Sequence, residues 1–235
     1  RVHLKTRLDA TVVRDLAPDA VVVATGALRD APPIPGADQL HVFSGDELRK
    51  LMTGEDPDVG RRKLAWIDRV MMFFGGLLGI TRNTALVRKL GHLWMPVGKR
   101  VAIVGGGLVG VELAEFLAER GRQVSVIEEG DKFGVELSVV RRWRVLHDLK
   151  ELGVVLINNT RVSSIEASSM KLAMEDGEVD IDADTVILAS GAQANLSLYD
   201  ALASMNIDTH IVGDCGGVGY IEGAMHSGNK VGRKL

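Results

Sequence analysis

The chain has 235 residues, which is long enough to bury a core and to form one large domain or two small ones. With 28 basic and 31 acidic residues its formal charge is −3, so composition gives no electrostatic reason to expect a nucleic acid or an anionic membrane surface as partner. The only cysteine, Cys215, excludes an internal disulfide, a paired-cysteine redox motif and a cysteine metal cluster, and it suits a reducing cytoplasm.

The first strand pattern is DAVVVA at Asp19–Ala24, and it runs into Thr25 and Gly26. A similar strand, DTVILA, runs into Ser190 and Gly191 in the second half of the chain. Because both buried strands end in the same turn of a small polar residue and a glycine, the pattern suggests two related domains.

The sequence around this first strand indicates one piece of a domain and not a whole domain. Arg1 opens directly into sequence typical of a domain interior, so we expect a fragment of a longer protein. The stretch PPIPGAD at Pro32–Asp38 is typical of a linker that ends the first domain piece. Ser44 then predicts the cap of a short helix within Val42–Met52.

Residues 53–98 carry an apolar run, Val70–Ile80, which three glycines interrupt. The run is too short to span a bilayer, which needs about 20 residues. We expect a helix that packs on a neighbouring domain, and the alternative is a helix that lies on a membrane or partner surface.

The most informative stretch is Arg100–Glu129, in which an apolar strand runs into glycines at G-x-G-x-x-G spacing. Gly105 permits the tight turn, Gly107 lets the backbone approach a pyrophosphate, and Gly110 lets the helix pack closely on the strand. The free N–H groups and the dipole at the helix start favour a bound diphosphate. The apolar stripe expected on this helix consists of Val109, Leu113, Phe116 and Leu117.

A second strand, Val124–Ile127, ends in Glu128, which is placed to accept hydrogen bonds from the adenosine ribose of NAD. A glycine fingerprint alone is weak, but here strand, helix, second strand and acid occur in the required order. The alternative is a glycine turn that only packs a helix on a sheet, or a relic site that binds adenosine without chemistry.

The patterns that follow Glu129 predict the remaining helix and strands of this nucleotide-binding domain. We expect a helix at Ser138–Leu152, a strand at Val154–Ile157, an antiparallel meander over residues 161–183 and a returning strand at Thr185–Leu188. None of the six histidines has metal-ligand spacing.

The last strand, Ile207–Val212, ends at Gly213 and Asp214, and a short helix follows from about Glu222. An acid at a strand end beside a glycine can bind a ribityl or ribose hydroxyl, whereas the alternative is an aspartate that only caps a helix.

These pieces resemble the two-dinucleotide-binding-domain flavoproteins of the pyridine nucleotide-disulfide oxidoreductase superfamily. The motifs are ATG at Ala24–Gly26, GGGLVGVE at Gly105–Glu112, VSVIEE at Val124–Glu129, ASGA at Ala189–Ala192 and VGDC at Val212–Cys215. Within that superfamily, GKRVAIVGGGLVGVELAEFLAERG and DTVILASGAQAN are similar to the carboxy-terminal half of the NADH:flavin oxidoreductases, which include 2,4-dienoyl-CoA reductase and trimethylamine dehydrogenase.

The resemblance implies an α/β fold in which a Rossmann-like three-layer NAD(P)-binding domain with a β-meander is inserted in an incomplete FAD-binding domain of the same type. Residues 1–38 and 194–235 would belong to the FAD-binding domain, 39–97 to a helical linker or insert, and 98–193 to the NAD(P)H-binding domain.

The resemblance also implies the residues that bind cofactors, and it implies neither a catalytic side chain nor a metal ligand. Asp214 would bind the FAD ribityl chain, and the helix start at Ile221–Ala224 would face the flavin. The nicotinamide coenzyme and FAD together would be bound by Gly105, Gly106, Gly107, Leu108, Val109, Gly110, Glu112, Glu128, Glu129, Ser190, Gly191, Ala24, Thr25, Gly26, Gly213, Asp214, Ile221 and Ala224.

The function implied is that of the electron-input part of a cytoplasmic flavin-dependent oxidoreductase. Hydride passes from NAD(P)H to FAD, and the parent protein reduces an enoyl-type substrate through FMN. The FMN-binding barrel, the iron–sulfur cysteines and the first FAD glycine fingerprint are missing from this chain, so its expected partners include those segments, and a homo-oligomer is left open.

Coenzyme choice follows from charge. Glu128 beside Glu129 repels a ribose 2′-phosphate and favours NADH, although Arg122 and Lys132 lie near enough in sequence to weaken that preference. Two other functions are alternatives: a non-catalytic module that binds ADP or serves assembly, and a complete small ferredoxin-type reductase, which the missing FAD fingerprint disfavours.

Overall fold

The chain forms two compact units, which are described separately. Unit 1 consists of Arg1–Asp30 and Gly191–Leu235, and unit 2 consists of Ala31–Ser190. The computed structural model describes residues 1–29, 32–45, 47–48, 63, 95, 97–175, 177–190, 192–205 and 207–235.

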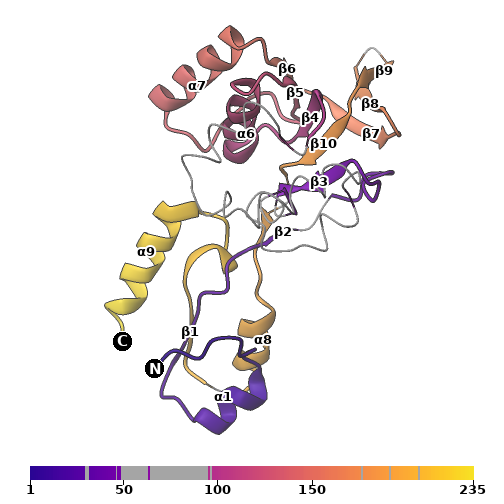
Figure 1. Ribbon diagram of the computed structural model, residues 1–235. Coiled ribbons are helices and arrows are strands. Elements are labelled where there is room, and N and C mark those ends of the chain that lie inside the picture. Colours follow the sequence, from indigo (N-terminus) through magenta and orange to yellow (C-terminus); the bar gives the residue numbers. More distant parts are fainter. Residues whose placement is uncertain are drawn as a thin grey trace, which may run out of the picture. The chain divides into compact units, whose positions relative to one another are not determined.

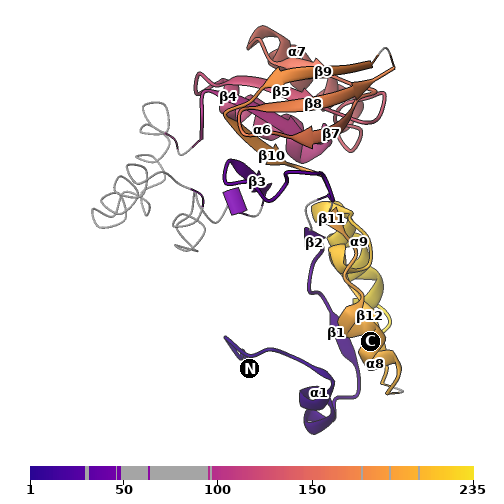
Figure 2. The same ribbon diagram turned by 90° about the vertical axis from the view of Figure 1, so that its right-hand side faces the viewer.

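Unit 2 is built on a five-stranded parallel sheet with strand order β3-β10-β4-β5-β6. Helices α6 and α7 cover one face of the sheet, and the antiparallel meander β7-β8-β9 covers the other (Figures 1 and 2). The elements are β3 (Val42–Ser44), β4 (Arg100–Val104), α6 (Leu108–Ala118), β5 (Gln123–Ile127), α7 (Val139–Glu151), β6 (Val155–Ile157), β7 (Arg161–Ile165), β8 (Ser169–Met174), β9 (Gly177–Asp182) and β10 (Thr185–Leu188).

Both faces of the sheet are buried because successive side chains along each strand point to opposite faces. In β4, Val101 and Ile103 pack in the cluster beneath α6 and α7, whereas Ala102 packs in the cluster beneath the meander. Ile187 and its neighbour Leu188 in β10 divide in the same way. A sheet that is buried on both faces reads as a continuous apolar run, which is the pattern of these strands. The predicted three-layer Rossmann-like fold is confirmed.

The predicted helix after the glycine turn is confirmed as α6, but its predicted buried stripe is partly wrong. The buried residues are Gly110, Val111, Ala114 and Leu117, while Val109 is 43% exposed. The sheet-facing side of the helix carries small residues because α6 approaches the end of β4 closely at Gly110. The larger Leu113 and Phe116 are therefore only partly buried at the edge of the cluster.

Helix α7 is confirmed, with Ser138 as its N-cap. Its core contacts come from Val145 and Leu149, and the apolar Val139 and Trp143 are 83% and 72% exposed. The third strand, the meander and the returning strand are also confirmed.

The strand that precedes the predicted helix cap at Ser44 was not predicted. Val42–Ser44 is the edge strand β3, which pairs in parallel with β10. The predicted cap at Ser44 is confirmed: Gly45, Glu47 and Leu48 are helical, the Ser44 Oγ accepts the Glu47 N–H at 3.1 Å, and Glu47 Oε2 accepts the Ser44 N–H at 3.0 Å. Most of the remaining stretch to Met52, and the apolar run Val70–Ile80, lie outside the described residues.

Unit 1 contains two small sheets. Strand β1 pairs in parallel with β12, and β2 pairs antiparallel with β11. Among the described residues of this unit, four form its buried cluster: Val13, Val23, Leu202 and Cys215. The elements are α1 (Ala10–Leu16), β1 (Val21–Val23), β2 (Leu28–Arg29), β11 (Ala192–Gln193), α8 (Ser197–Ala203), β12 (Thr209–Ile211), the 3₁₀-helix η2 (Gly213–Cys215) and α9 (Tyr220–Gly232).

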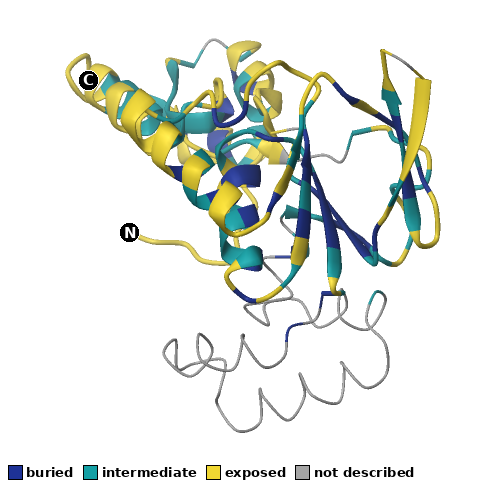
Figure 3. Cartoon of the chain, turned by 90° about the horizontal axis from the view of Figure 1, so that it is seen from above, coloured by how far each residue is buried: buried dark blue, intermediate teal, exposed yellow. Residues whose placement is uncertain are grey.

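Several of these elements depart from expectation. The first strand is shorter than Asp19–Ala24, and Val22 within it is 46% exposed. Helices α1 and α8 and the short strands β2 and β11 were not predicted. Helix α9 buries none of its residues, as the predominance of exposed and intermediate positions along it in Figure 3 shows. No helix within the described ranges combines the length and apolar character needed to span a bilayer.

Candidate nucleotide-binding site

The candidate site lies at the carboxyl ends of β4 and β5. The two strands pair in parallel with Val104 opposite Ile127, so the residues that follow them, Gly105 and Glu128, meet at one edge of the sheet. The Gly105 N–H donates to the Ile127 carbonyl at 2.8 Å, which fixes the start of the turn Gly105–Gly107. Ligands of open α/β sheets bind at this edge.

Each motif glycine meets a different environment. Gly105 has φ +108°, and a Cβ added there would lie 2.9 Å from the Ser190 backbone nitrogen. A Cβ on Gly110 would lie 1.9 Å from the Gly105 carbonyl oxygen. The atoms nearest to a Cβ on Gly107 would be those of the Glu136 carboxylate, with its nearer oxygen at 2.8 Å. The first and last glycines are therefore required by packing, whereas Gly107 keeps an open side free of its own side chain.

Glu128 faces the turn. Its Oε2 accepts the Gly106 N–H at 2.6 Å, and its Oε1 accepts the Gly130 N–H at 2.8 Å. These two backbone bonds hold the carboxylate at the edge of the sheet next to the start of α6. A carboxylate offers about four acceptor positions, so two remain for the hydroxyls of a ribose.

The start of α6 carries a contact that sequence reasoning missed. The Leu108 N–H donates to Glu136 Oε2 at 2.9 Å. Glu136 belongs to the loop between β5 and α7, and nothing in its local sequence marks it as a partner of a helix start. The available signal was indirect: α6 has no acidic residue in its first turn, and its N-cap, Gly107, has no side chain that could accept a hydrogen bond.

The acid next to Glu128 is neutralised. Arg161, at the start of β7, donates to Glu129 Oε1 from Nε at 3.0 Å and also from its terminal nitrogen. Lys132 pairs with Asp131 at 3.4 Å. The expected influence of Arg122 on this edge is wrong, because Arg122 precedes β5 at its amino end and the strand separates it from Glu128.

The other residues predicted here lie around the same edge. Ser190 lies against Gly105, as the close approach of its backbone shows. Glu112 is half exposed on α6 and pairs with Arg141 of α7 at 3.5 Å. Val109 is exposed beside the turn. Gly191 lies outside the described residues.

Unit 1 brings together the two segments predicted to bind FAD. Because β1 and β12 are parallel with Val23 opposite Ile211, Ala24–Gly26 and Gly213–Asp214 leave the sheet at the same end. The Val212 N–H donates to the Val23 carbonyl at 2.9 Å and continues this pairing beyond the strands. The segment Ala24–Gly26 ends at a glycine with a left-handed backbone, since Gly26 has φ +75°.

Asp214 is positioned by the start of α9. Its Oδ1 accepts the Gly219 N–H at 2.9 Å, and its Oδ2 has no hydrogen-bond partner within the described part of the chain. Gly213 has φ +76°, donates its N–H to Ser227 Oγ at 2.9 Å, and lies against Ala224, whose Cβ is 3.6 Å from the position of an added Cβ. Ile221 on the same helix is 79% exposed.

The residues present fit both cofactors to different extents. At the start of α6, the N–H groups of Gly107 and Val109 have no acceptor among the described residues, and a Cβ would fill the open side of Gly107. That arrangement fits a diphosphate with a ribose on Glu128. In unit 1 the free Oδ2 of Asp214 fits a sugar or ribityl hydroxyl. No group of acids, histidines or cysteines in the described ranges could hold a metal ion.

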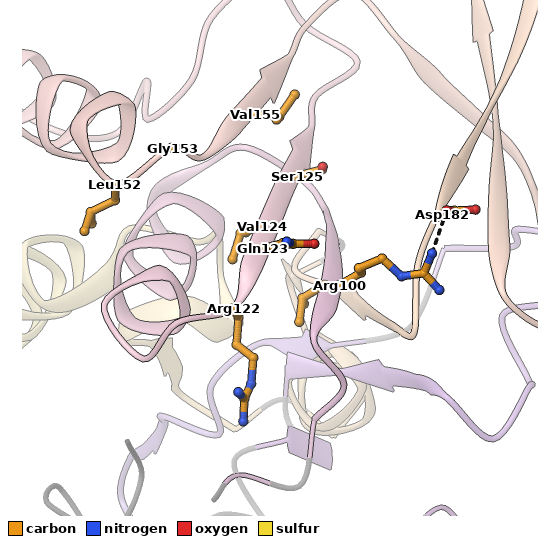
Figure 4. Close-up of a pocket in the computed structure, with 10 residues that line it drawn as sticks. Arg100, Arg122, Gln123, Val124, Ser125, Leu152, Gly153, Val155 and Asp182 are labelled. Carbon is orange, nitrogen blue, oxygen red and sulfur yellow. Dashed lines mark hydrogen bonds and ion pairs between the residues drawn. The ribbon is translucent and has the colours of Figure 1, made fainter. Parts of the chain in front are cut away.

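A cavity of ≈ 390 Å³ lies at the opposite edge of the sheet of unit 2, at the amino ends of β4 and β5 (Figure 4). Arg100 at its rim is held by Asp182 and Asp184, both at 2.6 Å. The hydrogen bond from the Arg100 guanidinium holds the pKa of Asp184 below its ordinary value. Because this cavity lies away from the carboxyl ends of the strands, it is not the nucleotide site.

The chain is similar in sequence to much longer proteins that are named as reductases and oxidases. It is 33% identical over 218 residues to a bilirubin reductase of Mediterraneibacter gnavus (strain CC55_001C), covering 91% of this chain and 28% of that protein. It is 25% identical over 225 residues to an NADH oxidase of Thermoanaerobacter brockii, covering 95% of this chain and 29% of that protein. The chain thus spans less than a third of the length of these relatives.

Solved structures share the fold. A 2-naphthoyl-CoA reductase in complex with 2-naphthoyl-CoA has a TM-score of 0.70 at 23% identity, and the match covers 99% of this chain and 29% of that one. Histamine dehydrogenase from Rhizobium sp. 4-9 has a TM-score of 0.68 at 18% identity, with 98% and 32% covered. The family model for pyridine nucleotide-disulphide oxidoreductases matches residues 2–215. The chain therefore belongs to the pyridine nucleotide-disulphide oxidoreductase family, whose members are flavoprotein oxidoreductases that use NAD(P)H.

Proposed function

We propose that unit 2 binds NADH at the start of α6 and that the chain is the electron-input part of a larger flavin-dependent reductase. The observation that carries this proposal is the open side of Gly107 at the N-terminus of α6, with the Glu128 carboxylate held beside it. A helix start without a side chain of its own, next to an acid at the end of the second strand, suits a diphosphate joined to a ribose.

Each residue at this edge has a role in the proposal. The N–H groups of Gly107 and Val109 hold the diphosphate, and Glu128 accepts the ribose hydroxyls while two backbone N–H groups fix its orientation. Ser190 and Glu112 lie beside the path of the coenzyme. The bound coenzyme and flavin would supply the hydride-transfer chemistry, and the chain supplies binding and orientation.

The preference for NADH rests on Glu128 alone. Glu129 is neutralised by Arg161, so it adds little repulsion against a 2′-phosphate. Glu128 is hydrogen-bonded only by backbone N–H groups in the described part of the chain, so its negative charge stays uncompensated at the ribose position.

Unit 1 contributes the later pieces of an FAD site in this proposal. Asp214 binds a ribityl hydroxyl, and Ala24–Gly26 with the start of α9 at Ile221–Ala224 line the cofactor. The relatives named NADH oxidase and bilirubin reductase support a reductase that takes electrons from NADH. We extend the proposal to a parent protein of the NADH:flavin oxidoreductase and 2,4-dienoyl-CoA reductase type, in which an FMN barrel with an iron–sulfur cluster reduces an enoyl-type substrate.

A second candidate is a non-catalytic module for assembly. The observation that favours it is the Glu136 carboxylate, which already binds the Leu108 N–H and partly fills the proposed phosphate position. Glu136 is an exposed side chain, however, and it can rotate away without disturbing the core.

Titration of the purified chain with NADH and with NADPH, by isothermal calorimetry and thermal shift, separates these candidates. The variant Gly107→Ala should fold like the parent chain, since its Cβ meets only a flexible side chain, yet lose NADH affinity by about tenfold or more as charge-assisted hydrogen bonds to the diphosphate lengthen. Gly232→Ala, whose Cβ meets nothing within 4 Å, is the matched control and should bind normally.

The outcomes of this titration differ for each candidate. NADH binding that Gly107→Ala weakens supports the proposal, and binding of NADPH as tight as that of NADH overturns the coenzyme preference. A folded chain that binds neither coenzyme would leave the assembly module as the better function.

A further inference from the structure

The carboxylate of Glu136 covers the part of α6 that the proposed function gives to a diphosphate. Its Oε2 accepts the Leu108 N–H at 2.9 Å, and its Oε1 lies 2.8 Å from the position of a Cβ on Gly107. The same side chain therefore binds one free N–H of the helix start and covers the open side of the turn.

Helix α6 has no anionic group of its own at its start. Its first turn contains no acidic residue, and its N-cap makes no side-chain hydrogen bond. A helix start carries unsatisfied N–H groups and about half a positive charge, so it stabilises any anion that reaches it. Glu136 supplies an anion to the first residue of the helix from elsewhere in the sequence, whereas Glu128 binds the Gly106 N–H ahead of the helix.

The loop that carries Glu136 is fastened on its amino-terminal side. The Gly134 N–H donates to the Gly106 carbonyl at 2.7 Å, and Arg142 Nε donates to the Phe133 carbonyl at 2.7 Å. Phe133 is buried and lies against Gly106, whose added Cβ would be 2.4 Å from the ring. Because the backbone is anchored in this way, Glu136 stays within reach of the helix start, while its exposed side chain is free to rotate.

We propose that Glu136 is a tethered competitor that occupies the diphosphate position of the coenzyme and sets the affinity of the site. This inference rests on the proposed function. Glu136 binds the Leu108 N–H, between the two N–H groups proposed for the diphosphate, and covers the open side of Gly107 through which the diphosphate has to approach. Only the fraction of molecules in which Glu136 has swung away can therefore bind, and the apparent Kd rises by the inverse of that fraction.

The same competition selects the kind of ligand. A single weak anion such as inorganic phosphate has to displace a carboxylate that is present at high local concentration. A dinucleotide adds contacts of its diphosphate and its ribose at Glu128, so it displaces Glu136 more readily. The site should therefore discriminate against inorganic phosphate more strongly than a glycine turn without an internal acid.

The test compares NADH binding by the full chain and by Glu136→Gln, measured by calorimetry. The amide removes the negative charge and leaves side-chain volume unchanged, so the Kd for NADH should fall by about three- to tenfold. Without coenzyme the same variant should melt slightly below the parent chain, because the helix start loses its anion. Tighter binding with lower intrinsic stability is a combination that a surface residue of no role would not produce.

Two further variants make the test specific. Glu151→Gln changes the net charge equally at the far end of α7 and should leave the Kd unchanged. Glu136→Asp keeps the charge on a shorter side chain that reaches Leu108 less well, so its Kd should lie between those of the parent chain and Glu136→Gln.

The outcomes separate this inference from the proposed function. If the parent chain and Glu136→Gln bind NADH equally, or if Glu151→Gln also tightens binding, the inference fails and the NADH site stands. If neither the parent chain nor Glu136→Gln binds NADH, the proposed function fails and takes this inference with it.

Discussion

Units 1 and 2 each bring a glycine and an acid together at the ends of parallel strands, but they support these residues differently. In unit 2 the strands belong to a five-stranded sheet with a buried cluster on each face. In unit 1 they belong to a two-stranded sheet over a cluster of Val13, Val23, Leu202 and Cys215, and α9 buries no residue. Similar local chemistry thus rests on very different amounts of buried apolar surface.

This difference teaches which site is organised before a ligand arrives. Burial stabilises by about 25 cal/mol per Å² of apolar surface, so unit 2 can hold the left-handed backbone of Gly105 and the aligned carboxylate of Glu128. Unit 1 gains little stabilisation from buried apolar surface, and the geometry around Asp214 depends on few contacts. Variants that act on one unit at a time can break or sharpen this contrast.

The largest expected effect is that of Leu202→Ala. Leu202 is fully buried in the small cluster of unit 1, and truncation of such a residue costs about 2–5 kcal/mol. We expect unit 1 to lose its order, with rapid trypsin cleavage at Arg7 and Arg14, while unit 2 still binds NADH. Limited proteolysis with mass spectrometry, together with an NADH titration, measures both effects.

Leu149→Ala is the matched control in unit 2, because Leu149 is equally buried. It should lower the stability of unit 2 and weaken NADH binding, while the cleavage pattern of unit 1 stays unchanged. Loss of NADH binding in Leu202→Ala would show that the two units are not independent in stability.

A smaller effect comes from two glycines that are required for different reasons. Gly110→Ala places a Cβ 1.9 Å from a backbone oxygen, so α6 must move, and we expect a loss of about 3 kcal/mol and of NADH binding. Gly213→Ala finds ordinary contact distance but a φ of +76°, which costs about 1–2 kcal/mol. Urea unfolding followed by circular dichroism measures the free energy of unfolding of each variant. Equal losses, or a larger loss in Gly213→Ala, would contradict the roles given to the two glycines.

The smallest effect is a pH dependence in unit 2. Burial lowers the pKa of His41 below its ordinary value of 6.5, against an opposing hydrogen bond with the Glu166 backbone. The unfolded chain therefore takes up the proton first, and stability that is present above pH 6.5 is lost as the pH falls through the folded-state pKa. His41→Gln should flatten the fall of Tm between about pH 7.5 and pH 5.5 by a few degrees at most.

The control for this measurement is His226→Gln on the exposed face of α9, where the imidazole is 81% exposed. That change should leave the pH profile of Tm as it is in the parent chain. A profile that His41→Gln does not alter would assign the acid sensitivity to other groups.

The central fold could be predicted because local signals agree there. Apolar runs at Val101–Val104 and Thr185–Leu188, glycines at fixed spacing and an acid at a strand end all indicate the same α/β unit. The prediction failed where tertiary contacts decide. Val42–Ser44 becomes a strand because β10 offers a free edge, and Val109 is exposed because the small residues of α6 face the sheet.

The candidate site was predictable only in its backbone part. The turn Gly105–Gly107 and Glu128 follow from spacing, whereas Glu136 reaches the start of α6 through a loop whose course no periodic pattern records. Arg161 likewise meets Glu129 only because the meander returns beside β5. Contacts between irregular segments depend on the folded chain and not on neighbouring residues in sequence.

The pairing of β2 with β11 has a consequence for how such a chain can be assembled or edited. Arg29 lies opposite Ala192, so the chain departs into unit 2 and comes back at adjacent points on one antiparallel ribbon. Everything between them behaves as a cassette with neighbouring ends. If a tight hairpin of a few residues replaced this cassette, the rest of unit 1 could keep its present chain path.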